Sequence, residues 1–122
     1  MEIEFQKKWD DLLRLLNKRF EQDMDTQAIL FLIGLQELGL TVEKLSKDQK
    51  LDVMHIAVCT LLEPYGFYEY EGRDRDDWPH WKTLKKLPRL NQLEQEGLIK
   101  KSIVEYFEER SILPQEAKEG YE

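Results

Sequence analysis

The sequence predicts an all-α fold: a compact bundle of four main helices plus one or two short helical turns, with an aromatic-rich irregular loop at about residues 64–80. Two observations carry this prediction. Apolar residues recur every three or four positions through most of the chain, and residues that cap helices precede these segments. We expect residues 1–110 to form a single helical domain and residues 111–122 to form an acidic C-terminal tail that frays.

The first two helices follow from the spacing of their apolar residues. The apolar face of the first helix consists of Phe5, Trp9, Leu12, Leu13, Leu16 and Phe20. A stripe with this spacing is typical of a helix packed against a core. Asp25 is placed to cap a second helix over residues 26–38, and Gly39 to end it. This helix is apolar on almost every side, so we expect neighbours all around it, and a second copy of the chain is one candidate.

The third helix begins after a capping pattern and ends before a proline. Ser46 and Gln49 form an S-x-x-Q capping box, and Pro64 disfavours helical geometry in the residue before it. The following FYEYE alternates like a strand, but a single short strand has no partner in a helical chain, so we assign residues 64–80 to a loop. Asp77 is placed to cap a short helical turn at the end of this loop.

The last main helix follows Asn91, which repeats the capping pattern with Glu94. Its apolar face contains Ile99, Ile103, Tyr106 and Phe107. Gly97 lies inside this helix, where glycine costs about 1 kcal/mol relative to alanine. It therefore marks either a close contact with another helix or a bend.

Composition excludes several classes of protein. The formal net charge of −7 repels a phosphate backbone, so we expect no nucleic-acid partner. The longest apolar run, residues 28–35, has eight residues, and about 20 are needed to span a bilayer, so we expect no membrane segment. The single cysteine, Cys59, cannot close an intrachain disulfide, which fits the cytoplasm. We predict a cytoplasmic protein that needs no cofactor.

Aromatic side chains are concentrated in the segment with the least regular pattern. Six of the thirteen Phe, Trp and Tyr residues lie between residues 65 and 81. Tyr, Trp and Arg recur at interaction hot spots because each combines a large apolar surface with a polar group. The contact residues that we predict are Tyr68, Tyr70, Arg73, Arg75, Trp78, His80 and Trp81. The alternative is that these rings only pack the loop onto the core.

Two histidines and the cysteine support a competing, enzymatic hypothesis. His55 and Cys59 are one helical turn apart, and each histidine follows an aspartate by three residues. A mononuclear metal site or an activated thiol could use Asp52, His55, Cys59, Asp77 and His80. A structural zinc site needs more Cys or His ligands, and a thiol in an apolar helix is usually inert. We therefore prefer the interpretation that His55 is a core histidine and Cys59 a small apolar core residue.

The chain contains no G-x-S-x-G, no glycine-rich phosphate loop and no H-E-x-x-H. The common enzyme signatures are thus absent from the sequence. We predict a small helical domain that acts as a non-enzymatic protein-interaction or ligand-binding module through residues 65–81, with an unknown protein or a small ligand as its partner. A metal-dependent or thiol enzyme is the alternative.

Overall fold

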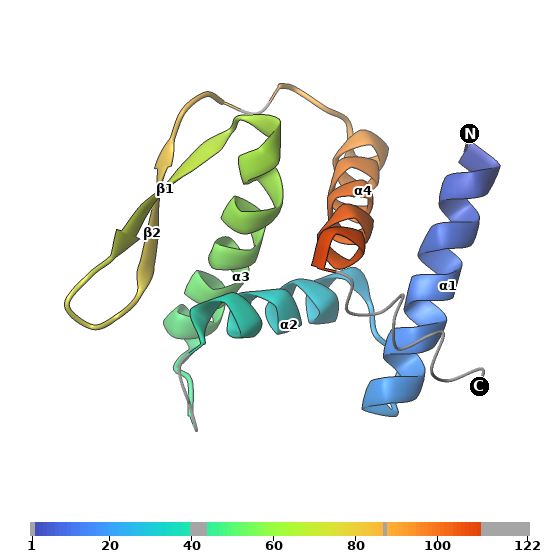
Figure 1. Ribbon diagram of the computed structural model, residues 1–122, viewed down its shortest axis with the longest axis horizontal. Helices are drawn as coiled ribbons and strands as arrows, with labels where there is room; N and C mark the ends of the chain where they lie inside the picture. Colours follow the sequence, from blue (N-terminus) through green and yellow to red (C-terminus); the bar gives the residue numbers. More distant parts are fainter. Residues whose placement is uncertain (1, 40–43, 87, 111–122) are drawn as a thin grey trace. The chain divides into compact units, whose positions relative to one another are not determined.

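The computed structural model describes residues 2–39, 44–86 and 88–110. Its elements in chain order are α1 (Glu2–Phe20), α2 (Thr26–Leu38), α3 (Lys47–Leu62), the short 3-10 helix η1 (Glu63–Tyr65), β1 (Tyr68–Arg73), β2 (Pro79–Thr83) and α4 (Gln92–Arg110) (Figure 1). They form two compact units. One contains α1 and α4; the other, Asp25–Arg89, contains α2, α3, η1 and both strands and is called the hairpin unit below.

The α1–α4 unit pairs the first and last of the described helices and buries residues from the apolar face of each. Trp9 on α1 and Ile103 on α4 are both buried. At the polar side of the pair, Lys8 forms an ion pair with Glu108 at 3.3 Å, and Lys100 lies over the ring of Trp9. The contacts between these two helices join the two ends of the described chain.

In the hairpin unit, α2 and α3 begin and end where their capping residues predict. Asp25 accepts a hydrogen bond from the backbone N–H of Ala28 at 2.8 Å, and Gly39 ends α2 with a φ of +70°. Ser46 and Gln49 form the predicted capping box at the start of α3. These local hydrogen bonds satisfy backbone groups that a helix end leaves without partners.

The two helices of the hairpin unit pack closely at Gly34. A Cβ atom at this position would collide with the carbonyl oxygen of Val53 and would lie 2.7 Å from its Cγ1 atom. Glycine therefore lets the backbones of α2 and α3 approach each other. Leu38, Val53 and Ile56 form a buried cluster beside this contact.

The prediction of an all-α fold is wrong. Of the described residues, 67% are helical, but 11% belong to an antiparallel two-stranded sheet. This sheet, the β1–β2 hairpin, occupies much of the segment that was expected to be an irregular loop, and it also replaces the helical turn that Asp77 was expected to cap (Figure 1). The strands pair from Tyr68 opposite Thr83 to Arg73 opposite Pro79.

The alternating FYEYE segment does form a strand, β1, because its partner strand β2 follows within the same loop region. The register of the β1–β2 pairing shifts between Tyr70 and Gly72, where an extra residue forms a bulge. Gly72 has a φ of +109°, a backbone conformation that favours glycine. Asp77, with a φ of +65°, occupies the left-handed region in the turn, which aspartate tolerates better than most residues.

Three further expectations concern membrane segments, the number of domains and the C-terminal tail. Among the described helices, none combines the length and the apolar character needed to cross a membrane. The expected single domain over residues 1–110 stays a prediction. The expected acidic tail, residues 111–122, lies outside the described residues.

Candidate functional site

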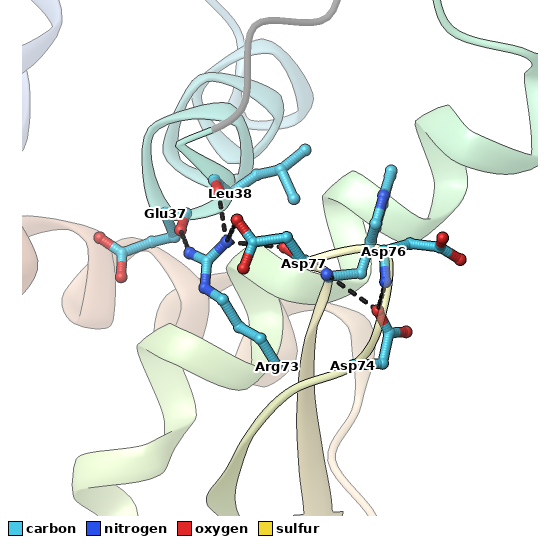
Figure 2. A network of polar contacts seen from close by, with 7 residues as sticks. Glu37, Leu38, Arg73, Asp74, Asp76 and Asp77 are labelled. Carbon is cyan, nitrogen blue, oxygen red and sulfur yellow. Dashed lines mark hydrogen bonds and ion pairs between the residues drawn. The ribbon is translucent and has the colours of Figure 1, made fainter.

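The turn of the hairpin is fixed to α2 by Arg73. Its guanidinium group donates hydrogen bonds to the carbonyl oxygens of Leu38 at 2.8 Å, Glu37 at 2.9 Å and Asp77 at 2.8 Å (Figure 2). Two of these carbonyls belong to the last turn of α2, where backbone acceptors lack helical partners. Arg73, predicted as a contact for a ligand, thus has its donors directed at the protein's own backbone.

Asp74 closes the turn itself. Its Oδ1 atom accepts hydrogen bonds from the backbone N–H groups of Asp76 at 2.9 Å and Trp78 at 3.1 Å, as Figure 2 shows in part. Its Oδ2 atom lies 2.7 Å from Nε2 of His80. The hydrogen bond with His80, followed by those with the backbone, lowers the pKa of Asp74 below its ordinary value of 3.8. The carboxylate is therefore ionised at neutral pH.

A cavity of about 320 Å³ lies between α3 and the hairpin and is called the α3–hairpin cavity below. Its lining from α3 consists of Asp52, His55 and Ile56, and its lining from the hairpin consists of Asp74, Trp78, Pro79, His80 and Trp81. Two carboxylates, two imidazoles and two indoles thus meet in one place.

The two tryptophans connect this cavity to the core. Trp78 and Trp81 are half-buried and pack against the cluster of Leu38, Val53 and Ile56. The indole N–H of Trp81 is buried and has no hydrogen-bond partner among the described residues. A buried donor without a partner lowers the stability of the fold by about 1–3 kcal/mol. Trp81 is therefore packed against the core although its N–H group makes no hydrogen bond with any described residue.

The structure brings together three of the seven predicted contact residues. Trp78, His80 and Trp81 line the α3–hairpin cavity. Tyr70 is 46% exposed and meets Trp81 edge to face with ring centroids 5.3 Å apart. Tyr68 is half-buried, with its ring at 6.2 Å from that of His55.

The remaining two predicted contacts lie around the turn, outside the lining. Arg73 is held at the end of α2, and Arg75 is exposed. Sequence reasoning missed Asp74, Ile56 and Pro79 as lining residues. For Asp74 a signal was available, because an aspartate at the start of a polar turn commonly accepts hydrogen bonds from backbone groups two residues on.

The residues of the enzymatic hypothesis are only partly assembled. Asp52, His55 and His80 line the cavity, whereas Asp77 lies by Arg73, 3.7 Å from its guanidinium. Within residues 2–39, 44–86 and 88–110, no group of three or more His, Cys, Asp or Glu side chains is placed to hold a metal ion. His55 is exposed rather than in the core, because its face of α3 borders the cavity.

Cys59 is the buried member of this set. Its sulfur lies 3.4 Å from Nε2 of His55, but burial, with a smaller contribution from Glu63, raises the pKa of the thiol to about 11. The thiolate is the nucleophilic form of cysteine, and at neutral pH it is almost absent here.

Comparison of the chain with protein-family models, curated proteins and solved structures finds no match.

Proposed function

We propose that this protein is a non-enzymatic binding module, and that its ligand occupies the α3–hairpin cavity. The observation that carries the proposal is the composition of the cavity lining, in which ionisable and aromatic side chains converge from two elements. Ligand sites typically combine apolar and aromatic walls with a few polar groups that fix orientation, in volumes of about 300–1,000 Å³. The volume of about 320 Å³ suits a small molecule or one side chain of a partner.

Two observations, one on Cys59 beneath the cavity-facing His55 and one on the cavity lining, support a binding role over catalysis. The high pKa of Cys59 and its complete burial leave the chain's single thiol unreactive in the native state. The pair formed by Asp74 and His80 resembles the orienting part of a catalytic site, but Asp74 already holds the turn through two backbone hydrogen bonds. The position of the Asp74 carboxylate is therefore explained by its structural role in the turn of the hairpin.

The indole N–H of Trp81, which is buried and has no hydrogen-bond partner among the described residues, is a further unusual feature of this lining. Conflicts between packing and hydrogen bonding concentrate at functional sites, where selection acts on the site rather than on stability alone. Trp81 belongs both to the core cluster and to the cavity lining.

The proposal can be tested with a library of small fragments and two-dimensional ¹H–¹⁵N NMR spectra of the full chain. We expect at least one fragment to shift the resonances of the cavity lining. His55→Trp should abolish this binding, since it adds an indole at an exposed lining position of α3. Leu51→Trp is the matched control, because Leu51 is 62% exposed on the same helix and does not line the cavity.

Equal loss of binding in both variants would argue against the cavity as the site. The same conclusion would follow if every fragment that binds shifts resonances elsewhere in the chain.

A further inference from the structure

We infer that the ligand group recognised by the α3–hairpin cavity is an organic cation, such as an ammonium or guanidinium group. This inference rests on the proposed function, and it specifies the chemistry of the ligand. Three properties of the cavity lead to it: the charge of its lining, its aromatic walls and the state of its two carboxylates.

The first property is charge. The lining contains Asp52 and Asp74, and none of its eight residues is lysine or arginine. An anion brought into the cavity would meet two carboxylates without a permanent positive charge to offset them. A cation would be attracted by both.

The second property is the pair of indoles from Trp78 and Trp81. Among aromatic side chains, tryptophan attracts cations most strongly through the negative potential of its ring face, and the attraction grows when the cation loses water. Both indoles are half-buried, so a cation bound beside them would be partly shielded from solvent. Aromatic side chains are a common solution for binding organic cations such as quaternary ammonium groups.

The third property distinguishes the two carboxylates. The carboxylate of Asp74 already forms hydrogen bonds with His80 and with backbone N–H groups of the turn. The side chain of Asp52 is exposed and makes no hydrogen bond or ion pair with any residue of the described chain. Asp52 is thus the carboxylate available for direct contact with a ligand, and Asp74 contributes its charge from a fixed position.

An organic cation fits this lining better than a metal ion. A bound divalent metal needs several ligand atoms at short distance, and no suitable group of three side chains exists among the described residues. An organic cation needs one carboxylate and an aromatic wall, and it has an apolar surface that Ile56 and Pro79 can cover.

The inference is tested by titrating the full chain with three probes of similar shape and different charge, at constant ionic strength. The probes are tetramethylammonium chloride, 2,2-dimethylpropan-1-ol and sodium pivalate, and binding is followed by ¹H–¹⁵N NMR shifts of the cavity lining. We expect saturable shifts with tetramethylammonium and much weaker shifts with the neutral and anionic probes. A further titration with Nα-acetyl-arginine amide distinguishes a peptide side chain from a free cation as the tighter ligand.

Two matched variants locate the interaction. Asp52→Asn should weaken tetramethylammonium binding about three- to fivefold, the range of an exposed ion pair. Asp48→Asn should change it by less than about 1.5-fold, because Asp48 is exposed one turn earlier on α3 and does not line the cavity. An equal effect of both substitutions would overturn the inference, since it would assign the attraction to the general charge of the helix.

The failure of this inference can be separated from the failure of the proposed function. If the neutral or anionic probe binds the cavity as tightly as the cation, the preference for cations is overturned and the binding site stands. If neither these probes nor the fragment library shift the cavity lining, both are overturned.

Discussion

Arg73 donates hydrogen bonds to three backbone carbonyl groups. Two belong to Glu37 and Leu38, which are distant in sequence, and the third belongs to Asp77 in the turn of the hairpin. Replacing it by alanine should lower the free energy of unfolding by about 1–2 kcal/mol, because charged hydrogen bonds are lost and the carbonyls of the last turn of α2 are left without this donor. Urea unfolding followed by circular dichroism measures the change. Arg75→Ala is the control: Arg75 is exposed in the same turn, and its loss should cost less than about 0.5 kcal/mol. Equal effects would contradict this role for Arg73.

His80 is the largest cause of the lowered pKa of Asp74. Because the folded-state pKa lies below 3.8, the interaction stabilises the hairpin above the ordinary pKa, and the stabilisation is lost as the pH falls through the lowered value. In His80→Gln, we expect the pKa of Asp74 to rise towards its ordinary value. Carboxyl ¹³C chemical shifts recorded between pH 2 and 6 would measure this. In His55→Gln, the control, the pKa of Asp74 should stay as in the wild type; an unchanged pKa in His80→Gln would show that the backbone bonds dominate.

Individual residues also mark the limit of what the sequence could predict about the site. Trp78, His80 and Trp81 were predicted as contact residues from residue type and local density alone, and the structure places them in the lining of the cavity. Asp52 and His55 were named only within the hypothesis of a metal-dependent or thiol enzyme, because their place beside the tryptophans depends on how the hairpin packs on α3. That packing is a tertiary contact between segments, and no local pattern encodes it.

At the scale of elements, the close packing of α2 against α3 depends on the absence of a side chain at Gly34. Gly34→Ala should destabilise the protein by about 1–3 kcal/mol, because the added methyl group collides with Val53 and this overpacking exceeds the gain in helix propensity. Thermal and urea unfolding would measure the change. The control is Gly97→Ala on α4, where no described atom outside that helix's own backbone lies within 4 Å of the added Cβ. There we expect stabilisation of up to about 1 kcal/mol. Destabilisation by Gly97→Ala, or a neutral Gly34→Ala, would contradict the argument.

Helices and strands differed in how well the sequence predicted them. The boundaries of α2 and α3 were recoverable, because caps and apolar spacing act within a few residues. The hairpin was missed because a strand is stable only with its partner, and its turn depends on side-chain hydrogen bonds from Asp74 and on a bulge at Gly72. The alternation of FYEYE was a correct local signal, and the assumption that no partner existed was the error.

At the scale of the whole molecule, the dominant property is the formal net charge of −7 at pH 7, with a pI near 5.0. Like charges keep copies of the chain apart, and this repulsion disappears as the pH approaches the pI. The expected association of α2 with a second copy stays a prediction, and any such apolar attraction would be least opposed near pH 5.

We therefore expect the solubility of the full chain to pass through a minimum near pH 5.0 and to recover on either side. The concentration that remains in solution after centrifugation, measured from pH 4 to 8, checks this. Lys7→Glu combined with Lys50→Glu changes two exposed positions and makes the chain more acidic, so the minimum should move to lower pH. If the minimum stays at the same pH in the double variant, association depends on a local titrating group rather than on net charge. A candidate for that group would be a surface carboxylate, and the decrease in solubility would then follow its pKa instead of the pI.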